Sequence, residues 1–352
     1  MTDLIHLHSH GHVAHVSLNR PRAIHALTLE MCQAMAAALL DWRQDEGIDV
    51  VLLDHGEGRG FCAGGDVAAL RNSATADGGK SGREFFHAEY RLNHLLFTYP
   101  KPVVAFMDGV TMGGGVGISQ PARYRVATEN TKFAMPEGAI GLFPDVGAGH
   151  YLPRLRGQVG KFLALTGARL DGAECAWAGL ATHYIESAHL AEVKARIIAA
   201  PDQVEAVLRE FSSRPPEPRL KGNKERIDRL FAPDTLEGII AALKGDDSDW
   251  AARELAAVTS KCPTTAKVAL RQFEENADCK DFAAEMAMEY RIAARMIMRP
   301  DFAEGVRAVL VDKDNAPTWD PATPEGVSEA MLDEIFAPLP ESEEWTPFPE
   351  AT

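Results

Sequence analysis

The sequence predicts an α/β fold, in which short apolar strands alternate with amphipathic helices over the first half of the chain. Residues 13–18, 50–53 and 102–107 are predicted strands, because each is a short, mainly apolar run. Between the first two of them, apolar side chains recur at helical spacing from Leu29 to Leu40. This strand–helix–strand order implies a parallel pair joined by a right-handed crossover. Open α/β sheets bind ligands at the carboxyl ends of such strands.

The next elements follow from local patterns along the chain. A hairpin is predicted from residues 4–8 and 13–18, with residues 9–11 as its turn. Residues 84–96 have a helical pattern, and the preceding residues 72–82, rich in Ser, Ala, Gly and Asp, are predicted to form a mobile surface loop. Further along we expect two short strands and two helices, at residues 124–127, 132–134, 160–166 and 172–178. Asp171 with Glu174 makes a capping box for the second of these helices.

From about residue 188 the pattern is helical almost throughout. Residues 214–218, Arg-Pro-Pro-Glu-Pro, interrupt it and indicate a linker or sharp turn. Residues 338–352 are acidic and proline-rich, which is typical of an extended tail. We therefore expect a catalytic α/β core over residues 1–188, and a helical C-terminal region with an acidic tail over residues 189–352.

Composition limits the classes of partner. The 352 residues are 46% hydrophobic and 25% charged, as in globular proteins with a large core. The formal net charge of −15 disfavours a nucleic-acid partner, because phosphate binding needs a basic face. The sequence shows no apolar run of membrane-spanning length and no N-terminal stretch with the pattern of a signal or transit peptide. No membrane partner is expected.

Cysteine and histidine usage gives no sign of a metal site. The five cysteines are an odd number without CxxC spacing, which argues against a disulfide framework or a zinc site. Reducing surroundings and a cytoplasmic location are expected. His6, His8, His10 and His12 alternate near the N-terminus, but a turn interrupts their register, and neither carboxylate nor cysteine accompanies them. A solvated face is favoured, and no metal is expected.

The stretch from Asp108 to Pro153 is the strongest candidate for a functional site. Gly113-Gly114-Gly115 is expected to open a helix there, and glycine lets backbone N–H groups approach a ligand closely. A helix N-terminus adds partial positive charge, which suits a developing oxyanion. Glu137 and Asp145 lie among apolar residues, where a carboxylate is costly unless it is used or paired. Taken singly, each feature has an ordinary structural explanation, and their combination is what singles out the stretch.

A second glycine loop, Gly60-Phe61-Cys62-Ala63-Gly64-Gly65-Asp66, lies upstream. Together the two loops resemble the crotonase (enoyl-CoA hydratase/isomerase) superfamily, whose oxyanion amides come from a G-D loop and the start of a glycine-triplet helix. MGGGVG, FAMPE and IGLFPDVG further resemble the 3-hydroxyisobutyryl-CoA hydrolases of that superfamily, as do EYR at 289–291 and DFAEGVRAVLVDKD at 301–314. Two departures are His25, where the superfamily usually has Asn, and His150, where an aromatic residue is usual.

The resemblance implies a crotonase-like (ClpP/crotonase) spiral core of twisted sheets and crossing helices. It also implies hydrolysis of the 3-hydroxyisobutyryl-CoA or 3-hydroxypropionyl-CoA thioester, in valine catabolism, without a cofactor. Gly65 and Gly114 would supply the oxyanion amides, and Glu137 would activate water or attack the acyl carbon. Asp145 would orient the water, bind the substrate hydroxyl or raise the pKa of Glu137. Glu89, in a segment similar to the hydrolases' E-Y-x-L-N, would lie near the acyl group, although by itself it is typical of a surface helix.

Other activities stay open at this point. Hydratases of the superfamily have a pattern similar to G-G-G-C-E, and this chain has Gly117 where that second glutamate would stand. An enoyl-CoA hydratase or isomerase is therefore disfavoured, and retention of Glu137 and Asp145 argues against a non-catalytic CoA-thioester-binding protein. Cys62, without a nearby histidine in the sequence, is interpreted as a buried structural thiol.

The partners implied are an acyl-CoA substrate and further copies of the chain. Because the net charge is strongly negative, the CoA phosphates need a local basic patch. The candidates in the sequence are Arg20, Arg22, Lys101 and Lys267. Members of the superfamily commonly form trimers or hexamers, so the resemblance implies a homo-oligomer, while the residues themselves do not report the oligomeric state.

Overall fold

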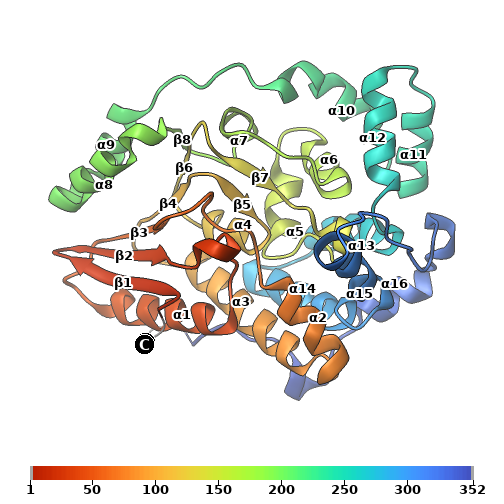
Figure 1. The fold of residues 1–352 in the computed structure, drawn as a ribbon, viewed down its shortest axis with the longest axis horizontal. Helices are drawn as coiled ribbons and strands as arrows, with labels where there is room; N and C mark the ends of the chain where they lie inside the picture. The colour runs from red at the N-terminus through yellow and green to blue at the C-terminus, as the bar shows by residue number, and fades with distance from the viewer. Residues whose placement is uncertain (1–2, 350–352) are drawn as a thin grey trace.

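Over residues 3–349, which the computed structural model describes, the chain is organised around a six-stranded sheet with the order β1-β2-β3-β4-β6-β8 (Figure 1). β1 runs antiparallel to β2, and each other neighbouring pair is parallel. The strands are β1 (Ile5–His10), β2 (Val13–Leu18), β3 (Val50–His55), β4 (Val103–Met107), β6 (Tyr124–Ala127) and β8 (His183–Tyr184). The predicted α/β class and the parallel pairing of 13–18 with 50–53 are confirmed.

Side chains alternate across this sheet, so each central strand supplies two apolar layers. Val50 and Leu52 of β3 pack with helices α8 (Leu190–Ala199) and α9 (Val204–Phe211). Val51 and Leu53 belong to the larger core, which includes helices α1 (Leu29–Gln44) and α3 (Lys80–Phe97). Figure 1 shows the two helix pairs on opposite sides of the sheet. Burial of both faces explains why β3 and β4 are continuous apolar runs in the sequence.

A second, two-stranded parallel sheet supports the glycine triplet. It pairs β5 (Val110–Met112), which follows β4 after a two-residue turn, with β7 (Lys132–Ala134). β5 leads directly into helix α4 (Gly114–Ser119), which confirms the helix predicted at the triplet. The sequence did not predict β5, because three residues between two glycines are too few to show a strand pattern.

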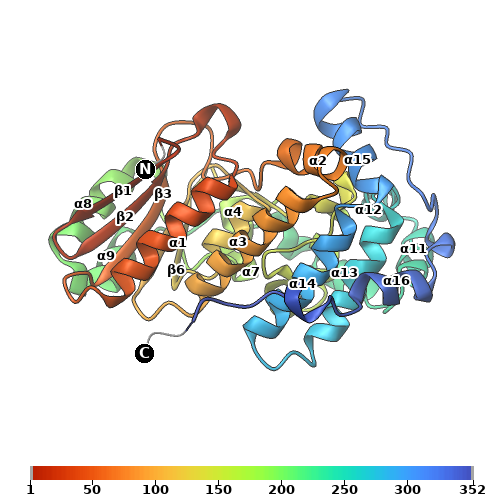
Figure 2. The same cartoon turned by 90° about the horizontal axis from the view of Figure 1, so that it is seen from below.

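Helices beyond the sheet complete the molecule. Residues 212–218 are extended, as the proline-rich sequence predicts, and connect α9 to helices at the other end of the sheet (Figure 1). Figure 2 shows α14 beside α3, and the two helices are in contact. The remaining helices are α5 (Ala148–Tyr151), α6 (Val159–Thr166), α7 (Gly172–Ala178), α10 (Lys224–Leu230), α11 (Leu236–Lys244), α12 (Asp249–Thr259), α13 (Pro263–Asn276), α14 (Phe282–Met296), α15 (Pro300–Val306) and α16 (Glu329–Phe336). The predicted capping box of α7 is present.

The predicted surface loop at 72–82 is wrong. These residues form the end of helix α2 (Val67–Ala76) and the start of α3, with only a short turn between them. Asp77 in that turn accepts hydrogen bonds from the Ser73 and Ser81 hydroxyls. Ser and Asp favour helix ends as well as loops, so composition alone did not separate the two.

The hairpin is confirmed, but its turn is shorter than predicted. β1 extends to His10, which pairs with Val13, and the turn consists of Gly11 and His12. The rings of His6, His8 and His10 lie next to one another on the exposed side of β1. The division of the chain at residue 188 stays a prediction, and residues 350–352 of the predicted tail lie outside the described part.

Candidate active site

One cavity of about 400 Å³ contains every residue that the sequence singled out for catalysis. These five candidates, which are among its lining residues, are Gly65, Glu89, Gly114, Glu137 and Asp145. Its other walls come from the 3-10 helix Glu137–Ile140 and from the π-helix Arg307–Val311. A larger groove of about 870 Å³ lies between α1, α3 and residues 342–348, and none of the five is among its described lining residues. The gathered polar groups, rather than size, identify the smaller cavity as the candidate site.

The two glycine loops lie side by side because their backbones run parallel. Cys62 and Thr111 form an isolated parallel bridge. Two residues further along, a Cβ built on Gly64 would lie 3.6 Å from the backbone nitrogen of Gly114. The loops therefore reach the cavity as neighbours.

The amides of Gly65 and Gly114 are oriented by the elements that flank them. Leu27 donates its N–H to the Gly64 oxygen at 2.7 Å, and its own oxygen accepts from the Asp66 N–H at 2.9 Å. Gly65 lies between Gly64 and Asp66, the two residues that bond to Leu27. In a parallel bridge of this kind its own N–H points away from Leu27. Gly114 is the first residue of α4, and helices leave their first N–H groups without intrahelical partners. Both amides are thus available to an acceptor in the cavity.

The triplet requires glycine for reasons that differ by position. Gly113 has φ +48° and ψ −121°, a backbone conformation that residues with a Cβ rarely adopt. At Gly114 a Cβ would lie 2.4 Å from Oε1 of Glu89, and at Gly115 it would lie 2.3 Å from the oxygen of Cys62. The glycine at position 114 therefore lets the backbone lie close to the Glu89 carboxylate.

Three carboxyl groups line the cavity with little exposure to solvent. Glu89, Glu137 and Asp145 are 2%, 5% and 4% exposed. Arg20 is the one Lys or Arg among the described lining residues, and its guanidinium is paired with Asp66 at 2.7 Å. The cavity wall therefore offers these carboxyls no free cation.

Burial raises the pKa of all three carboxyls. The pKa of Asp145 rises to about 7, chiefly through burial and against the hydrogen bond that the Tyr90 hydroxyl donates to its Oδ2 at 2.8 Å. Burial also raises the pKa of Glu137 and of Glu89 well above the usual range, and the nearby Asp145 adds to both. Like charges in an apolar site cannot all ionise at low cost, so ionisation of one of these carboxyls disfavours ionisation of the others.

Two of these carboxyls have oxygens that lack a partner. Within residues 3–349, no hydrogen bond reaches Oε1 of Glu89 or Oε2 of Glu137. Buried polar atoms in proteins are nearly always satisfied by protein or water. Both residues line the cavity, where a bound substrate or water would be the partner that satisfies these oxygens.

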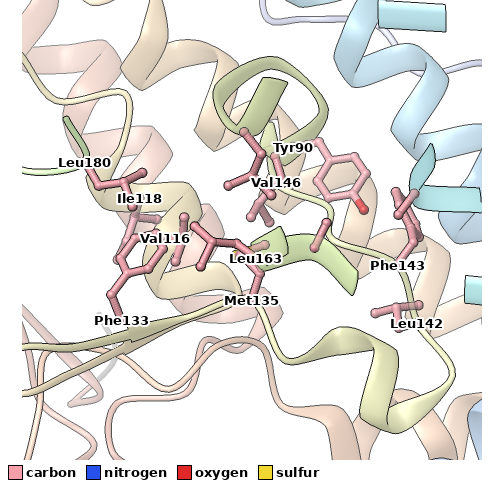
Figure 3. Close-up of a cluster of buried hydrophobic side chains, with 14 of the residues drawn as sticks. Tyr90, Val116, Ile118, Phe133, Met135, Leu142, Phe143, Val146, Leu163 and Leu180 are labelled. Atoms are coloured by element: carbon pink, nitrogen blue, oxygen red, sulfur yellow. The ribbon is translucent and has the colours of Figure 1, made fainter. Parts of the chain in front are cut away.

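The turn that follows Asp145 is strained. Val146 has φ +55° and Gly147 has φ +91°. For a β-branched residue such a positive φ is a genuine outlier, which costs about 1–3 kcal/mol. Figure 3 shows Val146 inside the cluster of buried apolar side chains that also holds Tyr90 and Phe143, and this packing holds the turn in place.

Gly117 leaves no room for a carboxylate at the position where hydratases of the superfamily have their second glutamate. A Cβ at Gly117 would lie 2.6 Å from the Cβ of Val146 and 2.9 Å from Nδ2 of Asn93. The side chain next to Asp145 in the chain thus fills the space that a glutamate would need.

Sequence reasoning missed several residues of the site. Tyr90 was not assigned a role, although it follows Glu89 in a segment already singled out. Val309 and Leu310 reach the cavity from the π-helix, and Leu310 is 45% exposed. The only signal for these two was the C-terminal motif at 301–314, which did not say where it would lie.

The four cations proposed for the CoA phosphates are mostly placed elsewhere. Arg20 lines the cavity, whereas Arg22, Lys101 and Lys267 are not among its described lining residues. Lys101 donates to the backbone oxygens of Trp42 and Asp45, and Lys267 pairs with Glu237 at 2.7 Å. Of the four, Arg20 alone stays a candidate contact for CoA.

Cys62 is buried, and burial raises the pKa of its thiol to about 12. A thiol with so high a pKa is not a nucleophile at neutral pH. The interpretation of Cys62 as a structural residue agrees with this environment.

Comparison with curated proteins shows close relatives over nearly the whole chain. The family model described as Enoyl-CoA hydratase/isomerase matches residues 13–336. The protein of Gallus gallus named 3-hydroxyisobutyryl-CoA hydrolase, mitochondrial, is 42% identical over 346 residues, which are 95% of this chain and 88% of that protein. The protein of the same name from Homo sapiens is 40% identical over 337 residues, which are 93% of this chain and 87% of that protein.

Solved structures with the same fold include two from bacteria. A carnitinyl-CoA dehydratase from Mycobacterium thermoresistibile has a TM-score of 0.93 and 38% identity, covering 99% of this chain and 100% of that chain. An enoyl-CoA hydratase from Rhodobacter sphaeroides 2.4.1 has a TM-score of 0.91 and 35% identity, covering 98% and 100%. The predicted crotonase-like fold is confirmed by these similarities.

The expected cytoplasmic location is wrong, because the curated relatives are named mitochondrial proteins. Free thiols require only reducing surroundings, which are not unique to the cytosol. Among the described residues no helix has both the length and the apolar character that crossing a membrane requires. The family match over residues 13–336 and relatives of 40% to 42% identity show that the chain belongs to the enoyl-CoA hydratase/isomerase family, the crotonase family.

Proposed function

We propose that this protein hydrolyses the thioester of 3-hydroxyisobutyryl-CoA to the free acid and CoA, a step of valine catabolism, with 3-hydroxypropionyl-CoA as a second substrate. The names of the curated relatives support the reaction. The observation that supports the reaction most directly is which carboxylates are present at the site and which one is absent. Gly117 has no space for the hydratase glutamate, while Glu137 and Asp145 line one cavity.

In the reaction, a bond forms from an oxygen nucleophile to the acyl carbon, and the carbon–sulfur bond then breaks. Negative charge develops on the thioester oxygen, and the N–H groups of Gly65 and Gly114 would stabilise it by hydrogen bonds. Loss of one such donor typically costs about 10²–10³ in rate. CoA leaves as a thiolate and takes up a proton.

Glu137 is the proposed base or nucleophile. In one route it removes a proton from water as the water oxygen attacks the acyl carbon. In the other route its carboxylate attacks, giving a mixed anhydride that water then hydrolyses. Both routes need Glu137 ionised at the moment it acts, and its raised pKa makes it a stronger base than a solvated glutamate.

Asp145 and Glu89 complete the proposed site. Asp145, whose pKa is about 7, is able to give or take a proton near neutral pH, and the Tyr90 hydroxyl fixes one of its oxygens. Glu89 presents the unpartnered Oε1 beside Gly114, where it would accept a hydrogen bond from the 3-hydroxyl of the acyl group. Glu89 and Asp145 are thus proposed to select 3-hydroxyacyl substrates.

A second candidate, water addition to an enoyl-CoA, has support in the names of the two similar bacterial structures, a dehydratase and an enoyl-CoA hydratase. One assay separates the two activities: free-thiol release from 3-hydroxyisobutyryl-CoA, beside crotonyl-CoA hydration followed by loss of enoyl absorbance. We expect thiol release without hydration. Hydration without thiol release would reverse the assignment, and binding of CoA thioesters with neither reaction would favour a non-catalytic binding protein.

Two features of the proposal concern partners. Arg20 is the proposed contact for a CoA phosphate, and an Arg20→Gln variant should raise KM more than it lowers kcat. We also propose that the chain forms a homo-oligomer, which light scattering on the purified protein would test.

A further inference from the structure

Glu289, on helix α14, contacts the loop that carries Asp145 and is not among the described residues that line the cavity. Its Oε2 accepts the Gly147 N–H at 2.8 Å, and its Oε1 accepts the Gln272 side-chain amide at 2.8 Å. The Gly149 N–H approaches Oε1 at 3.4 Å. Glu289 is completely buried, so these N–H groups take the place of solvent around its carboxyl group.

A second buried carboxyl, Glu285, lies one helical turn before Glu289, and the two side chains are hydrogen-bonded to each other. Asn276 donates to Oε2 of Glu285 at 2.5 Å, and Gln272 approaches its Oε1 at 3.5 Å. Burial raises the pKa of both glutamates, and within residues 3–349 neither forms an ion pair with a cation. Ionisation of both carboxyls at once is therefore disfavoured. The pair has no oxygen in the cavity wall, so it does not reach the substrate.

The loop that Glu289 binds is the strained turn after Asp145. Val146 has φ +55°, which an isolated chain would leave, and the surrounding contacts must keep it there. On one side Tyr90 holds the Asp145 carboxylate at 2.8 Å. On the other side Glu289 holds the backbone two residues later.

We propose that Glu289 is a positioning residue, which fixes the direction of the Asp145 carboxylate by binding the backbone at Gly147 and Gly149. This inference rests on the proposed function, because it assigns Glu289 a part in the same hydrolysis. Glu289 acts through Asp145 and touches no reacting atom. A misplacement of a catalytic group by about 1 Å can cost about 10² in rate, which sets the size of effect to expect.

The test compares Glu289→Gln with the matched variant Glu285→Gln. Both remove one buried carboxyl from the same pair, but only Glu289 accepts the N–H groups of Gly147 and Gly149. In Glu289→Gln the new NH₂ group faces donors, so one contact is lost. We expect kcat for thiol release to fall by about 10- to 100-fold with KM changed less than about threefold. Glu285→Gln should change kcat by less than about threefold.

A double-mutant cycle with Asp145→Asn separates positioning from general destabilisation. In the Asp145→Asn background, Glu289→Gln should change residual thiol release by less than about threefold, because the group that it positions is gone. An equal fold loss in both backgrounds would overturn the proposal, as would a Glu289→Gln enzyme with wild-type kcat or a Glu285→Gln enzyme equally impaired.

If Glu289→Gln does not fold, Gln272→Met tests the same point, because it removes the amide that holds Oε1 of Glu289. Its loss of kcat should likewise vanish in the Asp145→Asn background, and a loss that persists there contradicts the proposal. Failure of the proposed function gives a different result from failure of the Glu289 proposal, because the wild-type protein would then release no thiol. In that case the assignment of Glu289 falls with it.

Discussion

Replacing Asp145 with Asn should make the protein more stable at pH 8 while it lowers turnover. Burial raises the pKa of Asp145 from 3.8 to about 7, so the folded state holds a proton that the unfolded chain loses at lower pH. A tenfold change in proton affinity corresponds to about 1.4 kcal/mol, and the full penalty of ionising Asp145 is therefore about 4 kcal/mol at most. Asn has the same shape and no charge, so the variant escapes this penalty.

The sign of the pH dependence follows from the raised pKa. Below pH 3.8 Asp145 is protonated in both states and contributes nothing, whereas above about pH 7 it is ionised in both and the penalty is complete. Between these values the free energy of unfolding of the wild-type protein falls as pH rises. Between pH 5 and pH 8 the Asn variant should gain up to about 3 kcal/mol relative to wild type, measured by urea unfolding at both values.

Asp54 provides a matched control of opposite sign. It is also buried, but His15 and Lys194 contact its carboxylate at 2.8 and 2.6 Å and hold its pKa below the usual value despite burial. The stabilisation that Asp54→Asn removes is therefore complete above about pH 3.8 and is lost only as pH falls through the lowered pKa, so titration of Asp54 itself gives no change between pH 5 and pH 8. The reasoning that burial raises the pKa of Asp145 would be refuted if the free energies of unfolding of Asp145→Asn and wild type differed by the same amount at pH 5 and at pH 8.

The other predictions concern activity and packing. Glu137→Gln should lower kcat for thiol release by about 10²–10⁴-fold while KM changes little. Near-normal thiol release, in a preparation free of contaminating thioesterase, would remove Glu137 from the mechanism. As pH falls, wild-type kcat/KM should decline at a pH well above 4.5, and Asp145→Asn should move that limb to lower pH because its charge raises the pKa of Glu137. Glu89→Gln should impair 3-hydroxyisobutyryl-CoA hydrolysis more than hydrolysis of an acyl-CoA without the 3-hydroxyl, and equal losses would exclude the proposed contact. Gly117→Ala should destabilise the fold by about 1–3 kcal/mol by displacing Val146, whereas Gly222→Ala, with nothing within 4 Å of its new Cβ, should be neutral in thermal unfolding.

The sequence predicted the elements whose signal is local. β3 and β4 are buried on both faces, which leaves continuous apolar runs, and the capping box of α7 is complete within four residues. Helix α2 was missed because the Asn, Ser, Ala and Thr residues in its second half are also common in loops. β5 was missed because a three-residue strand is defined by its partner β7, whose paired residues lie 22 positions later, and not by its own pattern.

The residues of the candidate site likewise divide into those with a local signal in the sequence and those defined by contacts between distant segments. Gly114, Glu137 and Asp145 were found because glycines and carboxylates among apolar residues are unusual in a sequence. The contacts of Tyr90 with Asp145 and of Glu289 with Gly147 span 55 and 142 residues, and no local pattern encodes such a distance. The sequence therefore identified the groups proposed for chemistry more readily than the groups that hold them.

The buried glutamates near the candidate site differ in whether their oxygens have hydrogen-bond partners, and this difference helps to tell a structural role from a proposed role in the reaction. Glu289 accepts hydrogen bonds from a side-chain amide and from backbone N–H groups, as buried structural groups do. Burial raises the pKa of Glu89 and Glu137 as well, but each keeps an oxygen without a partner, and both residues line the cavity. A fold selected only for stability would have satisfied these oxygens or replaced them with apolar groups, since an unsatisfied buried acceptor costs about 1–3 kcal/mol. Asp301 also keeps a carboxylate oxygen without a partner, but it is not among the described residues that line the cavity. An unpartnered oxygen together with a place in the cavity wall is therefore what supports Glu137 and Glu89 as the residues proposed to meet the substrate.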